Sequence, residues 1–206
     1  GGCAGDADHN AIIDADDARQ ISAAWRAAKL GQPIDARLDW NSNGDIDAQD
    51  AQQTGARLGR RCGTATGETH DEQASGTQIA VVAPSEVTLG QVVTVPVRVE
   101  NARELGAYEF DLRFDSSMME VLTMTHGSMP LNAARLFTRI PPVIDNKAGL
   151  ARYGAYSRGS RDAGLTGAGT LVNIVIRYKT TRAPEFQVTR QLFADVSAAH
   201  AQGAIM

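Results

Sequence analysis

The chain has 206 residues, of which 43% are hydrophobic and 21% charged, a composition typical of a globular protein and not of a disordered one. Its formal net charge of −4 is too small to suggest a nucleic-acid-binding protein. The sequence has no run of about 18 apolar residues, which excludes a transmembrane helix. It begins with neither a signal peptide nor an initiator Met, so we expect a mature or excised fragment.

Charged and aromatic residues divide the chain into two parts. Residues 1–62 contain ten Asp, no Glu and seven Lys or Arg, whereas residues 77–206 contain eleven acidic and thirteen basic residues. Both Trp lie before residue 41, and every Phe and Tyr lies after residue 107. Residues 63–76 have three Gly and no large apolar side chain, which is typical of a flexible linker. We therefore predict two domains, 1–62 and 77–206, joined by a linker at 63–76.

Residues 1–62 contain an internal repeat with a spacing of 33 residues. Each copy is a 12-residue loop with Asp or Asn at positions 1, 3, 5, 9 and 12. Ca²⁺ takes six to eight oxygen ligands at about 2.3–2.6 Å, and a loop with alternating oxygen side chains and a backbone carbonyl at position 7 can supply them. The repeat therefore predicts two Ca²⁺ sites. The predicted ligands are Asp6, Asp8, Asn10, Ile12, Asp14 and Asp17 in loop 1, and Asp39, Asn41, Asn43, Asp45, Asp47 and Asp50 in loop 2.

Two positions in the loops carry further expectations. Position 6 needs a turn that Gly makes easily, so Gly44 fits and Ala11 does not; we expect the first site to be strained or weaker. Position 8 is Ile13 or Ile46, and we expect these two residues to join the loops through a short β bridge.

A helix is expected after each loop. The first places Ile21, Ala24, Trp25 and Ala28 on one face, and the second, more polar helix has Thr54, Arg57, Leu58 and Arg61. Gly31 and Pro33 end the first helix.

Alternating side chains predict strands in the second part of the chain. Over 107–114, Tyr108, Phe110, Leu112 and Phe114 share one face, while Glu109, Asp111 and Arg113 share the other. Further strands are expected at 78–83, 92–100, 118–125, 150–157, 170–179 and 186–196, and the stretch 127–147 is ambiguous. Many short strands with turn residues between them predict an antiparallel sandwich.

The paired calcium loops, each followed by a helix, make residues 5–60 resemble a dockerin, the calcium-dependent docking domain of cellulosome enzymes. The stretches VVTVPVRVE (92–100), LGAYEFDLRFD (105–115) and LTGAGTLVNIVIRYK (165–179) make residues 77–206 resemble a cohesin, the β-sandwich partner of dockerins. The resemblance implies a small all-α loop–helix domain followed by an all-β antiparallel sandwich of jelly-roll type.

The same resemblance implies where partners bind. Dockerins use loop positions 10 and 11, which are Ala15, Asp16, Ala48 and Gln49 here. Cohesins use one sheet face, where Glu109 occupies an acidic position of the family and Arg113 is a weaker candidate. The implied partners are a cohesin for residues 1–62 and a dockerin for residues 77–206.

The two cysteines, Cys3 and Cys62, lie at the two ends of the calcium-loop unit. A disulfide between them would tie together the ends of a domain that is too small for a large core; the alternative is two unpaired thiols. Together with calcium loops suited to extracellular Ca²⁺, the pair indicates a secreted or cell-surface protein.

No catalytic motif is found. Glu109, Asp111 and Asp115 are close in sequence but are expected on a sheet surface, and the four His have no zinc spacing. We therefore predict a non-catalytic, calcium-dependent assembly module with two bound Ca²⁺. It either connects outside partners as an adaptor or pairs its own two halves, within or between chains. The alternative is a carbohydrate-binding sandwich anchored by the first unit, with Tyr153 and Tyr156 as candidate surface rings.

Overall fold

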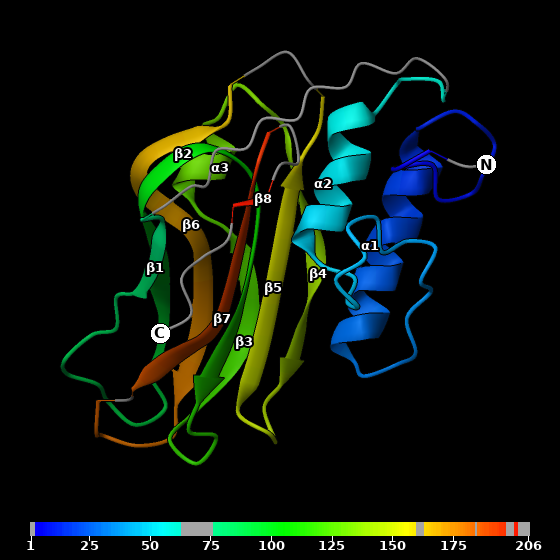
Figure 1. Cartoon of the computed structure of the whole chain (residues 1–206). Helices are drawn as coiled ribbons and strands as arrows, with labels where there is room; N and C mark the ends of the chain where they lie inside the picture. Colours follow the sequence, from blue (N-terminus) through cyan, green and yellow to red (C-terminus); the bar gives the residue numbers. More distant parts are fainter. Residues whose placement is uncertain (1–2, 63–75, 160–162, 184, 197–199, 202–206) are drawn as a thin grey trace.

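The computed structural model describes residues 3–62, 76–159, 163–183, 185–196 and 200–201 (Figure 1). The described part contains three helices, α1 (Ala15–Lys29), α2 (Ala48–Arg57) and α3 (Ser128–Leu131). Its strands are β1 (Gln78–Val81), β2 (Val92–Phe114), β3 (Met119–His126), β4 (Phe137–Asp145), β5 (Leu150–Ser157), β6 (Leu165–Tyr178), β7 (Phe186–Asp195) and β8 (His200–Ala201). Most of the expected linker, residues 63–75, lies outside the described residues.

Each of the two long helices begins at a loop carboxylate. Asp14 caps α1 and Asp47 caps α2, and the residue three positions later, Asp17 or Asp50, accepts a hydrogen bond from the cap backbone in return. Such reciprocal bonds satisfy N–H groups that the first helical turn leaves free. The second helix ends at Arg57, so Leu58 and Arg61 lie outside it, contrary to the expectation from sequence.

The expected bridge between Ile13 and Ile46 does not form. The N–H of Ile13 donates to the carbonyl of Arg60 (2.9 Å), and its own carbonyl accepts from the N–H of Gly59 (2.7 Å). Both backbone groups of Ile13 are thus used by the segment that follows α2. The N–H of Ile46 instead donates to the carboxylate of its neighbour Asp45 (2.8 Å).

One long strand, β2, connects the two layers of the sandwich. Its first half pairs with β1 and β6, and its second half pairs with β5 and β7. The two expected strands at 92–100 and 107–114 are therefore one continuous strand. The register shifts near Asn101 and Glu104, which both have positive φ, because the strand bends there as it passes from one layer to the other.

The sandwich core lies between the two layers, and the antiparallel sandwich expected from sequence is confirmed. Tyr108, Phe110, Leu112 and Phe114 of β2 all point into this core, as their alternation predicts. The ambiguous stretch 127–147 contains the short helix α3 and the edge strand β4.

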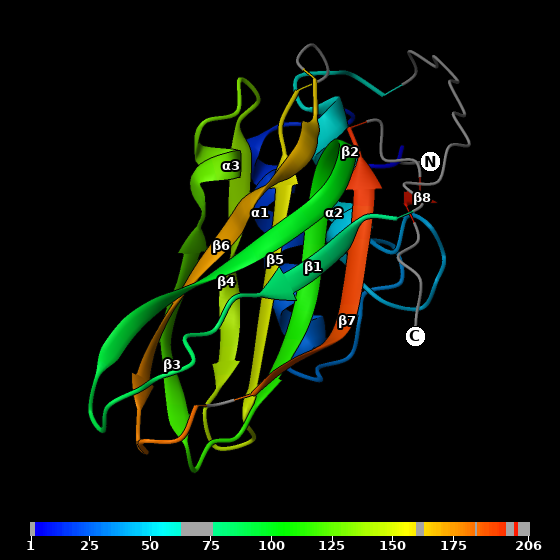
Figure 2. The same cartoon turned by 90° about the vertical axis from the view of Figure 1, so that its left-hand side faces the viewer.

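The calcium-loop unit, which we define as residues 3–62, packs on one outer face of the sandwich. Figure 1 shows α1 and α2 beside β4 and β5, and Figure 2 shows both helices behind that layer. Apolar side chains from both parts form one continuous buried cluster. It includes Ile21, Trp25, Ile46 and Ala51 from the unit and Ala107, Ile140, Val143, Tyr156 and Ala194 from the sheet. We call the outer surface of β4, β5, β7 and the second half of β2 the docking face.

Asn146 supports an irregular part of the sandwich. In the turn before β5, its side chain accepts a hydrogen bond from the N–H of Val121 (2.7 Å) and donates to the carbonyl of the same residue (2.9 Å). Val121 is buried and borders a register shift in β3. We expect Asn146→Ala to lower the free energy of unfolding by about 1–3 kcal/mol, because buried backbone groups lose their partners. Chemical denaturation measures this change, and Asn132→Ala, at an exposed position after α3, is the control.

Candidate functional site

The centre of the docking face is the side chain of Glu109 on β2, which is only 1% exposed. Its Oε2 accepts a hydrogen bond from the indole Nε1 of Trp25 on α1 (2.6 Å) and another from the backbone N–H of Ala48 (2.8 Å). Ala48 is the first residue of α2, where a free N–H and the positive end of the helix dipole favour an anion. Both long helices of the unit thus donate to one carboxylate oxygen of the sandwich.

Two cations neutralise this carboxylate. Lys29 Nζ on α1 lies 3.2 Å from Glu109 Oε1, and Arg190 Nη2 on β7 lies 3.3 Å from the same atom. Both cations also pair with Asp45 of loop 2, at 2.8 Å and 2.7 Å. Burial raises the pKa of Glu109, while Lys29 and Arg190 act to lower it. For Asp45 the two cations outweigh burial, so its pKa is lowered. Acidic and basic side chains of the unit thus pair with oppositely charged side chains of the sandwich.

The polar side chains of α2 bond to the backbone at strand ends. Gln52 Oε1 accepts from the N–H of Ser157 at the end of β5 (3.1 Å), and its Nε2 donates to the carbonyl of Val196 (3.2 Å). Gln49 Nε2 donates to the carbonyl of Phe193 on β7 (3.2 Å). This explains why a helix of polar composition is almost fully buried: its amides satisfy strand groups that would otherwise lose water.

The first helix makes similar contacts at its own end of the docking face. The hydroxyl of Tyr156 on β5 donates to the carbonyl of Ala18 (3.1 Å), and Arg152 Nη1 donates to the carbonyl of Lys29 at the end of α1 (2.5 Å). Tyr156 is therefore covered by α1, and Tyr153 is stacked in the sandwich core. Neither tyrosine is an exposed ring, so the expectation of a sugar platform on these residues is wrong for the described structure.

The two predicted calcium loops have the same internal geometry. Six backbone N–H groups, at positions 2, 5, 6, 7, 9 and 11, donate to side-chain oxygens at positions 12, 3, 1, 5, 12 and 9 in both copies. Both residues at position 6, Ala11 and Gly44, have positive φ, at 68° and 87°. Ala11 thus adopts the left-handed conformation that the sequence pattern requires of it and that a Cβ disfavours.

The residues of loop 1 fit a hard cation. Carboxylate oxygens of Asp6, Asp8 and Asp17 lie within 4.8 Å of one another. Asp6 is 1% exposed, and its buried Oδ1 has no hydrogen-bond partner among the described residues, which leaves that oxygen free for a metal ion. In loop 2, burial and the nearby carboxylates of Asp47 and Asp39 raise the pKa of Asp50 to about 7, against hydrogen bonds that lower it. A bound cation would relieve this crowding of negative charge.

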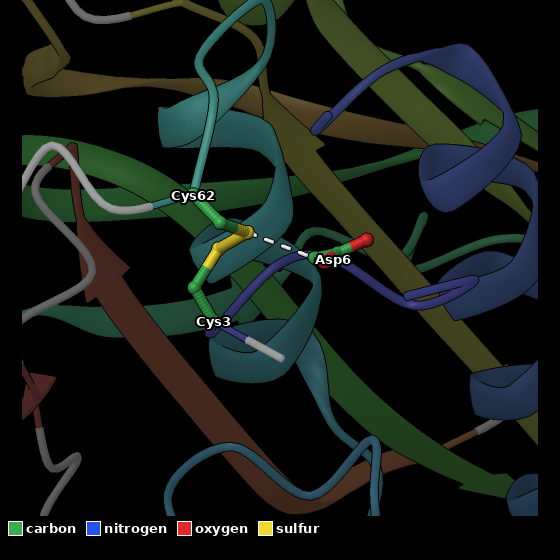
Figure 3. A group of neighbouring side chains, drawn as sticks. All are labelled: Cys3, Asp6 and Cys62. Carbon is green, nitrogen blue, oxygen red and sulfur yellow. Dashed lines mark hydrogen bonds between the residues drawn. A yellow bond between two sulfur atoms is a disulfide. The ribbon is translucent and has the colours of Figure 1, made fainter. Parts of the chain in front are cut away.

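A disulfide between Cys3 and Cys62 joins the segment just before loop 1 to the segment after α2 (Figure 3). Asp6 Oδ2 lies 3.2 Å from the Sγ of Cys62. Because a disulfide sulfur carries no proton, this is a close contact and not a hydrogen bond. Cys62 also donates its N–H to the carbonyl of Ala11 (3.0 Å), so the disulfide and the backbone together hold loop 1 against residues 59–62.

The predicted partner-binding residues separate into two groups. Ala48, Gln49 and Glu109 meet in the docking face, whereas Ala15 and Asp16 of the first loop are exposed. Arg113 is also exposed, further along β2. The sequence alone did not predict these contact residues: Trp25, Lys29, Gln52, Tyr156 and Arg190. Only Trp25 gave a signal, as a large residue on the apolar face of an expected helix.

No helix in the described parts of the chain is long and apolar enough to cross a membrane.

Replacing Ala11 with Gly should relieve the strain in loop 1. We expect Ala11→Gly to raise the free energy of unfolding of the chain by about 0.5–1 kcal/mol, because Gly adopts positive φ without a steric cost. Thermal unfolding at fixed Ca²⁺ concentration measures the change. Ala15→Gly, at an exposed position in the first turn of α1, is the control and should be destabilising. A neutral or destabilising Ala11→Gly would contradict the prediction.

Comparison with known proteins assigns the second part of the chain. The Cohesin domain family matches residues 77–203. Cellulose-binding protein A of Clostridium cellulovorans is 32% identical over 69 residues, which are 34% of this chain and 4% of that protein. The chain therefore spans only a small part of this relative. The family match begins at residue 77, so the dockerin resemblance of residues 5–60 stays a prediction.

Solved structures agree on the fold. A type II Cohesin-X-Dockerin complex from Acetivibrio cellulolyticus contains a chain with a TM-score of 0.52 and 9% identity, covering 63% of this chain and 93% of that one. The second type II cohesin module of an adaptor scaffoldin from the same organism has a TM-score of 0.50 and 8% identity, covering 64% of this chain and 86% of that one. Cohesin domains are non-catalytic protein–protein interaction modules of cellulosome-type scaffoldins. With the family matched over more than half of its length, the chain belongs to the cohesin family.

Proposed function

We propose that this protein is a calcium-dependent, non-catalytic assembly module in which residues 3–62 and the cohesin domain are a cognate pair that closes within one chain. The observation that carries the proposal is the burial of Glu109 under the calcium-loop unit, with donors from both α1 and α2 on one of its oxygens. A carboxylate that is removed from water is tolerated only where such partners are supplied. The docking face is therefore matched to this particular unit.

The comparisons support a dockerin-type partner for the face. One similar cohesin belongs to a complex that contains a dockerin, and residues 5–60 resemble that kind of domain. In the adaptor alternative, the cohesin domain receives an outside dockerin and residues 1–62 bind an outside cohesin. That alternative requires the docking face to open first, because the unit covers Glu109, Gly154 and Tyr156 in the closed form. No specific observation on the described residues supports the carbohydrate-binding alternative.

Calcium would act through the fold of the unit. Bound Ca²⁺ would supply positive charge to the loop carboxylates and so fix each loop in one conformation. Loop 2 contains Ala48, whose N–H donates to Glu109, and Asp45, which pairs with Arg190 of the sandwich. Order in loop 2 thus positions groups in the docking face. The disulfide between Cys3 and Cys62 and the use of Ca²⁺ support a secreted or cell-surface location.

Cutting the chain between its two parts tests the pairing and its calcium dependence. A protease site placed within residues 66–73 allows the full chain to fold before it is cut, and the disulfide joins the two ends of the unit after cleavage. We expect the two pieces to sediment together in millimolar Ca²⁺ and to separate in EDTA, because loop 2 loses the charge balance that positions Ala48. Pieces that separate in Ca²⁺ would contradict the pairing. Pieces that stay together in EDTA would contradict its calcium dependence.

A substitution at Glu109 tests the centre of the docking face. We expect Glu109→Ala to weaken the association of the cut pieces by about 2–5 kcal/mol, because Lys29 and Arg190 lose a buried carboxylate and two donors lose their acceptor. Analytical ultracentrifugation in Ca²⁺ gives the dissociation constant. Arg113→Ala, an exposed position on the same strand, is the control and should leave it nearly unchanged. Equal effects of the two substitutions would contradict a specific role for Glu109.

A further inference from the structure

We propose that two glycines, Gly55 on α2 and Gly154 on β5, determine which partner the docking face accepts. The face fits a loop–helix unit that has no Cβ where Gly55 lies and an indole ring over Gly154. This chain's own residues 3–62 meet both conditions. The inference rests on the proposed function, because it names the features by which the same face selects its partner.

At Gly55 the helix comes unusually close to the end of β5. The carbonyl of Gly55 accepts a hydrogen bond from the N–H of Gly159 (3.0 Å), so helix backbone and sandwich backbone are bonded directly. A Cβ on residue 55 would lie 2.2 Å from the carbonyl oxygen of Ser157 and 2.8 Å from Cδ2 of Tyr156. Ser157 is held in place by its pairing with Phe137 on β4. The carbonyl therefore cannot move away without disturbing the sheet.

The local structure of α2 gives no other reason for glycine at this position. Gly55 lies within the helix and does not have the positive φ that would favour glycine. In a helix interior, Gly is about 1 kcal/mol less favourable than Ala. The residue is thus unfavourable for α2 by itself and becomes favourable only through contact with the sandwich.

Gly154, on the sandwich side of the contact, is likewise unfavourable for its own strand and favourable only through the contact. It pairs directly with Glu109 in the sheet register, and Gly weakens a strand interior. A Cβ on residue 154 would lie 2.9 Å from Cζ2 and 3.0 Å from Cε2 of Trp25. The missing side chain leaves room for the indole to lie across β5 and to reach Glu109 with its Nε1 at 2.6 Å. Recognition of Glu109 by this donor therefore depends on Gly154.

The two glycine positions differ in how well they would tolerate a side chain. The atom facing residue 55 is a backbone oxygen, which is fixed, whereas the atoms facing residue 154 belong to a side chain, which can adjust. Any side chain in place of Gly55 should thus be rejected, and a methyl group in place of Gly154 should be tolerated once the ring is smaller. This difference gives the proposal two independent tests.

The first test is Gly55→Ala in the full chain with the cleavable linker. We expect the dissociation constant of the cut pieces in Ca²⁺ to rise at least about tenfold, because overpacking against fixed backbone is strongly unfavourable. The far-ultraviolet circular dichroism spectrum of the cut N-terminal piece, which contains α2, should be unchanged, since Ala is the better helix former. Gln20→Ala, on the exposed side of α1, is the matched control. A dissociation constant within twofold of the parent value would overturn the proposal.

The second test is a double-mutant cycle between Gly154→Ala and Trp25→Phe. We expect Gly154→Ala to weaken association severalfold with Trp25 present and to have a smaller effect with Phe in its place. Equal effects in the two backgrounds would overturn the role of Gly154. Separation of the unmutated pieces in Ca²⁺ would overturn the proposed function itself, and with it this proposal. Failure of the selection rule alone appears instead as variants that bind as tightly as the parent.

Discussion

The burial of one carboxylate, that of Glu109, determines how the two parts of this protein fit together. An ionised carboxylate loses several kcal/mol of hydration when it is buried, so its partners must be in place. Here they come from three directions: the indole of Trp25, the free N–H at the start of α2, and the cations Lys29 and Arg190. A shift of either helix would leave Glu109 without one of them. The buried charge of Glu109 therefore fixes the orientation of the unit on the sheet. The surrounding apolar cluster adds buried area to the contact but does not define this orientation.

The two loops have different relations to this contact although their internal hydrogen bonds match. Loop 2 contains Asp45 at position 7 and Ala48 at position 10, so its conformation sets the positions of groups that meet the sandwich. Loop 1 is instead bound to residues 59–62 by backbone hydrogen bonds and by the disulfide. Its positions 10 and 11, Ala15 and Asp16, are exposed. The two repeats are similar in sequence but not in function, because loop 2 pairs directly with the sandwich through Asp45 and Ala48, whereas loop 1 is bonded to residues 59–62.

Much of the fold could be predicted from the sequence, because its causes are local. Alternation in 107–114 follows from the pleat of a strand, and the start of each helix follows from a capping carboxylate. The continuous strand β2 and the pairing of Ile13 with Arg60 could not be predicted, since each depends on contacts between distant segments. The same holds for the site. The family pattern predicts a role for Glu109, whereas Gln52 and Arg190 act on groups that only the folded chain brings near them.

The nature of the contact suits a partner on the same chain. With both loops occupied, the net charges of the two parts would have the same sign, so electrostatic attraction between them arises from the local order of Lys29, Asp45, Glu109 and Arg190. Such a polar contact need not be tight in solution. A linker of this length gives an effective concentration on the order of 1 mM, so a dissociation constant of about 10 μM would keep roughly 99% of the chains closed. An outside partner of equal intrinsic affinity would then bind about a hundredfold more weakly than it would to an open face. Steric selection at Gly55 increases this advantage further, because a competing helix with any side chain at that position cannot approach β5 as closely.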